Sequence, residues 1–113
     1  MDKEYCLYFR KGADLHTTYE RGHTYWITPT NTKDKRKYGH PTVKPQEIIE
    51  NLILNSSHEG EVVLDPFSGS GTTGAAAIKH GRNYIGIEAN KQYYEISVDR
   101  LTQCKHLFFS NTI

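Results

Sequence analysis

A glycine-rich segment between two regular elements constrains this chain more than any other feature. Residues 65–74 read Asp-Pro-Phe-Ser-Gly-Ser-Gly-Thr-Thr-Gly, in which Gly69, Gly71 and Gly74 form a G-x-G-x-x-G pattern. An apolar segment precedes this pattern and an alanine-rich segment follows it. The order predicts a strand, a tight turn and a helix, which together form a nucleotide-type binding crevice.

The periodicity of apolar residues predicts alternating helices and strands from Pro45 onwards. The predicted elements are a helix over 45–56, a buried strand over 61–65, a helix over 72–80 closed by Gly81, a buried strand over 83–88, and a helix over 91–104 with Tyr94, Val98 and Leu101 on one face. This order predicts parallel strands joined by right-handed crossovers.

The N-terminal part of the chain has a different composition. Strands are predicted over 4–10 and 24–28, followed by an exposed loop over 29–44. Residues 1–45 carry nine Lys/Arg and five Asp/Glu, a net +4, whereas residues 46–113 carry a net −3. Attraction to DNA and ordinary solvated loop charge both account for this asymmetry. The predicted phosphate contacts are Lys33, Lys35, Arg36 and Lys37, beside aromatic residues that can stack on bases or fill a core.

The chain has the size of one small domain. Its 113 residues are divided into a basic N-terminal part, 1–44, and a crevice-forming part, 45–113. The longest apolar run, 75–78, is far short of the roughly 18 residues that span a bilayer, so a cytoplasmic protein is expected. Cys6 and Cys104 are far apart and outside any metal-binding pattern, so neither a metal site nor a disulfide is predicted.

Two carboxylates indicate which ligand the crevice binds. Glu88 follows Gly69 by nineteen positions, at the end of the second predicted strand, where it can accept hydrogen bonds from ribose hydroxyls. Asp65 ends the first strand, where it would repel a pyrophosphate and attract the ammonium and sulfonium of S-adenosylmethionine. Asp65 can instead cap the following turn. The pair favours S-adenosylmethionine over a dinucleotide.

Two motifs together resemble those of DNA methyltransferases that modify an exocyclic amino group of adenine or cytosine. They are Gly-His-Pro-Thr-Val-Lys-Pro at 39–45 and Asp-Pro-Phe-Ser-Gly-Ser-Gly-Thr-Thr at 65–73. The resemblance implies an α/β fold, a partial Rossmann-like methyltransferase domain with a mostly parallel sheet and flanking helices. By the same resemblance, the residues that bind S-adenosylmethionine are Thr42, Lys44, Asp65, Phe67, Gly69, Gly71, Thr72, Glu88 and Asn90.

The family's catalytic Pro-Pro-aromatic loop has no counterpart in this sequence. The four prolines, at positions 29, 41, 45 and 66, are never adjacent. The resemblance therefore predicts the cofactor-binding portion of a site-specific DNA methyltransferase, with catalysis in a segment supplied in cis or in trans, or with self-association covering an incomplete sheet. The alternatives are an inactive binding module, RNA methylation, and a nicotinamide-dependent dehydrogenase based on the glycine pattern alone.

Overall fold

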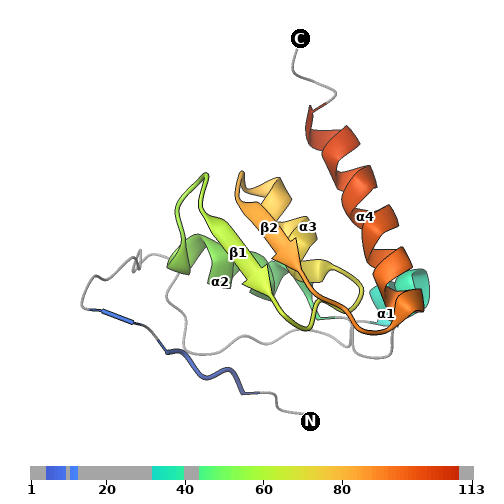
Figure 1. Ribbon diagram of the computed structural model, residues 1–113, viewed down its shortest axis with the longest axis horizontal. Helices are drawn as coiled ribbons and strands as arrows, with labels where there is room; N and C mark the ends of the chain where they lie inside the picture. The colour runs from blue at the N-terminus through green and yellow to red at the C-terminus, as the bar shows by residue number, and fades with distance from the viewer. Residues whose placement is uncertain (1–4, 10, 13–31, 40–43, 110–113) are drawn as a thin grey trace.

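In the part of the chain that the structure describes, two parallel strands carry helices against one face. This computed structural model describes residues 5–9, 11–12, 32–39 and 44–109. The elements follow in the order α1 (Thr32–Tyr38), α2 (Gln46–Ser56), β1 (Val62–Asp65), α3 (Thr72–Lys79), β2 (Asn83–Gly86) and α4 (Lys91–Phe109). In Figure 1, α2 and α3 lie behind the sheet and α4 lies beside it. From α2 onwards, this is the predicted alternation.

β1 and β2 pair in parallel, as predicted. Val62 lies opposite Asn83, and Asp65 lies opposite Gly86. Both strands therefore end at the same edge of the sheet, and the chain turns there into the glycine-rich loop after β1. Each strand is shorter than predicted, so Glu88 lies two residues beyond the end of β2.

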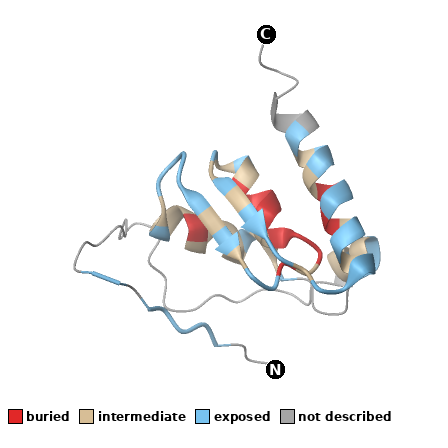
Figure 2. Cartoon of the chain, in the orientation of Figure 1, coloured by how far each residue is buried: buried red, intermediate tan, exposed pale blue. Residues whose placement is uncertain are grey.

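The prediction that both strands are buried is wrong. Leu64 and Ile85 are 60% and 54% exposed, whereas Val63 and Tyr84 pack towards the core. The cause is the alternation of side chains in a strand, which sends successive residues to opposite faces. α3 covers one face, and the face turned towards the viewer in Figure 2 is largely exposed.

α3 packs closely because its buried side is made of very small residues. Ala76 and Ala77 are fully buried, and Gly74 leaves no room for a side chain. A Cβ atom at Gly74 would lie 2.5 Å from the Tyr84 ring and 2.7 Å from Leu101. The backbone of α3 therefore contacts β2 and α4 directly. The predicted end of this helix is confirmed by Gly81, which has a left-handed φ of 75°.

α4 is longer than predicted, and of its predicted apolar face Leu101 packs against α3 whereas the other two residues do not. It extends to Phe109 rather than ending at 104. Tyr94 and Val98 on the predicted apolar face are exposed, whereas the polar Ser97 and Arg100 are buried. The reason is that α4 packs against the polar loop that follows β1. None of the described helices combines the length and apolarity that a bilayer crossing requires.

The structure also corrects the prediction for the N-terminal part. The basic segment that was expected to be a loop contains α1, because residues 32–38 hold neither proline nor glycine and include good helix formers. Residues 5–9, within the predicted strand 4–10, are exposed and form no strand with the other described residues. The predicted strand over 24–28 lies outside the described residues.

An ionic cluster joins α2 to α3. Glu50 accepts hydrogen bonds from Lys79 Nζ at 3.0 Å, from His80 Nε2 at 3.2 Å and from Gln46 Nε2 at 2.9 Å. Burial raises the pKa of Glu50, but the hydrogen bonds from its three partners outweigh this effect and hold the pKa below its usual value. The ionised carboxylate is therefore the form that the folded state favours.

We expect the Glu50 cluster to make the free energy of unfolding depend on pH. A lowered folded-state pKa stabilises the fold above the unfolded value of 4.5, and the contribution is lost as pH falls through the folded pKa. Glu50→Gln should therefore lower the free energy of unfolding by roughly 1 kcal/mol at neutral pH and by progressively less below about pH 4.5. Urea denaturation across this range measures it, with Glu47→Gln on the same helix as control. A pH-independent difference would contradict the assignment.

Candidate functional site

The loop between β1 and α3 is held by hydrogen bonds at each of its turns. Asp65 Oδ1 accepts a hydrogen bond from Phe67 N at 3.0 Å, and Gly71 N donates to Ser68 O at 3.0 Å. Ser68 N donates to Ile87 O at 2.9 Å, which ties the loop to the chain leaving β2. The turn-capping role of Asp65, one of the two sequence interpretations, is therefore present in the structure.

Gly71 has a backbone conformation that favours glycine, and it leaves little room for a side chain. Its φ of 84° lies in the left-handed region, and a Cβ atom there would lie 3.1 Å from Ser97 Cβ on α4. Gly69 also has a positive φ, of 55°. The loop can therefore turn sharply into α3 while α4 lies close behind it.

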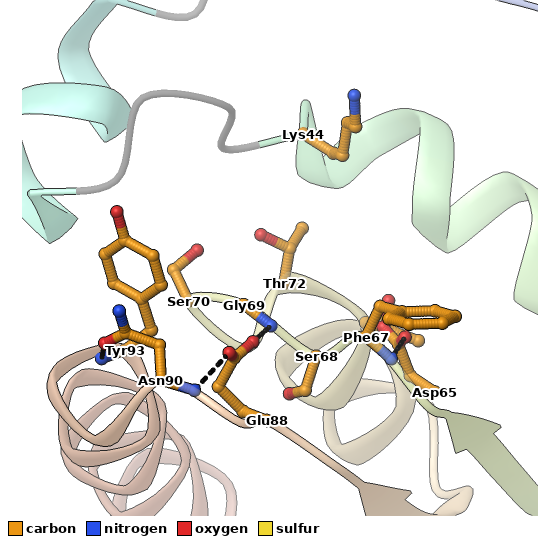
Figure 3. A pocket seen from close by; sticks show the side chains of 11 residues that line it. Lys44, Asp65, Phe67, Ser68, Gly69, Ser70, Thr72, Glu88, Asn90 and Tyr93 are labelled. Atoms are coloured by element: carbon orange, nitrogen blue, oxygen red, sulfur yellow. Dashed lines mark hydrogen bonds between the residues drawn. The ribbon is translucent and has the colours of Figure 1, made fainter.

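Glu88 bridges the two segments that follow the strands, the loop after β1 and the segment after β2. Its Oε2 accepts a hydrogen bond from Gly69 N at 2.7 Å, and its Oε1 accepts one from Asn90 N at 2.8 Å (Figure 3). Asn90 Oδ1 accepts from Tyr93 N at 3.1 Å and caps the start of α4. The Glu88 carboxylate thus links the glycine-rich loop to the segment that enters α4.

These elements enclose an open pocket of about 360 Å³. Seven of the nine residues predicted for the cofactor line it: Lys44, Asp65, Phe67, Gly69, Thr72, Glu88 and Asn90. Gly71 is buried in the loop behind the lining, and Thr42 lies outside the described residues. The lining also includes residues that sequence reasoning missed, namely Ser68, Ser70, Thr73 and Tyr93. Three of these four are part of the glycine-rich motif itself, so their positions could have been inferred from it.

Charge and polarity vary around the pocket. Asp65 at the end of β1 and Glu88 just beyond β2 provide carboxylates, whereas Lys44 lies on the segment before α2, with its ammonium group directed away from the other labelled side chains (Figure 3). Beneath the loop, the Tyr84 hydroxyl lies 2.8 Å from Ser68 Oγ. Burial and the nearby charge of Asp65 raise the pKa of Tyr84, although the Ser68 hydrogen bond opposes them, so its phenol stays protonated at neutral pH.

The four predicted phosphate-contacting residues are on α1 and are not among the residues that line the pocket. Lys33, Arg36 and Lys37 are exposed, at spacings that place them on one side of the helix, and Lys35 is half-buried. The residues that the structure describes contain no cluster of three His, Cys, Asp or Glu side chains able to hold a metal. Cys6 and Cys104 are both free thiols.

A family model described as "DNA methylase", N6_N4_Mtase, matches residues 3–99. The chain belongs to this family of amino-group DNA methyltransferases. The assignment confirms the resemblance carried by the two motifs and sets aside the interpretation as a dehydrogenase.

Members of the DNA methylase family are similar to this chain over different lengths. It is 51% identical over 67 residues to the DNA adenine methyltransferase YhdJ of Escherichia coli K12, covering 59% of this chain and 23% of that protein. The M1.HpyAVI–S-adenosylmethionine complex matches 75% of this chain and 43% of its own, at 34% identity and a TM-score of 0.62. The PvuII DNA methyltransferase (cytosine-N4-specific) matches 77% of this chain and 29% of its own, at 27% identity and a TM-score of 0.53.

These matches confirm the predicted Rossmann-like fold and identify S-adenosylmethionine as the family's methyl donor. The matched part spans about a quarter of the length of the curated relatives. Several relatives are named Type II methyltransferases.

Proposed function

We propose that this chain is the S-adenosylmethionine-binding portion of a site-specific DNA methyltransferase, which transfers a methyl group to an exocyclic amino group of adenine or cytosine in DNA. One observation carries the proposal. Asp65 and Glu88 line the same pocket from the ends of two adjacent parallel strands, with a glycine-rich loop between them. Two carboxylates repel a pyrophosphate and attract a cationic ligand.

The hydrogen bonding of both carboxylates is compatible with a bound cofactor. Each oxygen of Glu88 accepts a backbone hydrogen bond, and because a carboxylate oxygen can accept more than one, these two bonds are compatible with ribose hydroxyls as additional donors. Asp65 uses Oδ1 for Phe67 N, which leaves Oδ2 for the ligand ammonium. Phe67, 88% exposed at the rim, offers an apolar surface to the adenosine.

The first test is cofactor binding by Asp65→Asn. Asparagine keeps an oxygen for Phe67 N but removes the negative charge, so the turn can persist while attraction to the ligand falls. We expect about tenfold weaker binding of S-adenosylmethionine in isothermal titration, corresponding to the loss of one charged hydrogen bond. Asp99→Asn, exposed on α4, is the control.

Two results would overturn the proposal. One is equal affinity of Asp65→Asn and the unaltered chain. The other is no heat from the unaltered chain at millimolar cofactor concentration, with its fold confirmed by circular dichroism.

A second candidate function is a binding module without turnover. The observation behind it is that no two prolines are adjacent in these 113 residues, so they hold no Pro-Pro-aromatic loop to receive a flipped base. Both candidates use the same pocket, and they differ in whether a catalytic segment acts with it in cis or in trans. Transfer of tritiated methyl groups from S-adenosylmethionine to unmethylated DNA separates them.

The bare face of the sheet is the surface proposed to pack against further protein, either the remaining methyltransferase segments or a second copy. Leu64 and Ile85 are paired in register, so their exposed side chains are neighbours, and Val62 and Ile87 extend the same apolar face. Such a contiguous patch is unfavourable in water.

We expect the 113-residue chain alone to self-associate through this face. Leu64→Lys combined with Ile85→Lys should lower the average mass in sedimentation velocity towards that of a monomer, because charge repels at a symmetric contact. Val98→Lys, which replaces an exposed apolar residue on α4, is the control. An unaltered chain that is monomeric at all concentrations would contradict the prediction.

DNA is the proposed polymer partner of α1. Replacing Lys33 and Arg36 by Glu should weaken binding to duplex DNA and reduce the slope of log K against log salt by about 0.9 for each phosphate that is no longer neutralised. The matched control reverses Lys91 and Lys105, two exposed lysines of α4. Fluorescence anisotropy at several salt concentrations measures both. If the two double variants behave alike, α1 has no specific role.

A further inference from the structure

Arg100 is a buried cation whose hydrogen bonds with the described residues all go to uncharged oxygens. Its side chain lies on α4 and the residue is 5% exposed. Nη1 donates to Thr72 Oγ1 at 3.0 Å and to Ser70 O and Oγ at 3.4 Å, and Nη2 donates to Gln46 Oε1 at 3.2 Å. Among the described residues, a buried charge with neutral hydrogen-bond partners costs free energy, so stability alone explains its burial poorly.

These contacts dictate the direction of the hydroxyl groups in the loop. A guanidinium group only donates hydrogen bonds, so Thr72 Oγ1 and Ser70 Oγ must accept from Arg100. The hydroxyl hydrogens are then free to donate elsewhere, and both residues line the pocket. In Figure 3 the two side chains lie between Lys44 and the Gly69–Glu88 hydrogen bond.

This corner has the opposite polarity to the rest of the pocket. Asp65 and Glu88 are negative, whereas the corner combines two oriented hydroxyl donors and the guanidinium group behind them. Thr72 is also the first residue of α3, where the helix dipole favours negative charge. A ligand that carries both charges would place its anion here.

We infer that Arg100 is a positioning residue that turns the hydroxyl groups of Ser70 and Thr72 towards the carboxylate of the cofactor's methionine moiety. The inference rests on the proposed binding of S-adenosylmethionine and adds a residue outside the pocket lining to it. Arg100 acts through the two hydroxyls rather than by touching the ligand.

α1 contributes to the same arrangement. The Tyr38 ring lies over the guanidinium, with 4.0 Å from the Arg100 Cζ to the ring centroid. The flat contact shields the cation from water, which strengthens its hydrogen bonds to the loop hydroxyls. The last residue of the basic helix is therefore in contact with the group that orients the cofactor loop.

The test compares two ligands, S-adenosylmethionine and its decarboxylated analogue, by titration calorimetry. The variants are Arg100→Met, Thr72→Val and their combination, and Thr102→Val removes an exposed α4 hydroxyl as the control. We expect Arg100→Met to weaken the binding of S-adenosylmethionine roughly tenfold or more. The same variant should weaken the binding of the decarboxylated analogue by less than about twofold. The double variant should bind little more weakly than the weaker single variant, because both changes break one chain of hydrogen bonds.

Equal weakening for both ligands would overturn the role of Arg100 and leave the proposed function intact, whereas no binding by the unaltered chain would overturn both. If circular dichroism shows that Arg100→Met does not fold, Thr72→Val decides. This variant keeps Arg100 in place. It too must weaken the binding of S-adenosylmethionine more than the binding of the decarboxylated analogue.

Discussion

The hydrogen bond between Gly69 N and the Glu88 carboxylate is the contact on which the site depends. It joins the loop after β1 to the segment after β2, and the same carboxylate accepts from Asn90 N at the entrance to α4. Together with the hydrogen bond from Ser68 N to Ile87 O, it holds the two loops that leave neighbouring strands against each other. The carboxylate thus joins the two loops and is also part of the pocket lining, so one side chain both builds the crevice and faces it.

The part of the fold fixed by local pattern could be predicted from sequence. Helical spacing of apolar residues located α2, and the small residues after the glycine pattern located α3. Burial of the strands could not be predicted, because apolar residues such as Leu64 and Ile85 look the same whether or not another layer covers them. α1 was missed because the surrounding Pro, Gly and Asn residues outweighed the helix-forming run within it.

The same distinction applies to the site. Residues within a motif, such as Asp65 and Thr72, came together in the pocket because the motif specifies its own turn. Arg100 gave no signal, since a basic residue on an amphipathic helix is expected to face solvent. Its burial results from α2, α4 and the loop meeting at one point, and such a long-range arrangement leaves no local pattern in the sequence.

Gly74 has a consequence for how the loop behaves as a binding surface. Because Gly74 has no side chain, α3 lies with its backbone against the Tyr84 ring of β2 and the Leu101 side chain of α4, so on the α3 side of this contact no rotamer change can alter the spacing. The loop that starts α3 is therefore held in one place before any ligand arrives. A preorganised loop of this kind loses little conformational entropy on binding, so more of each contact's free energy appears as affinity.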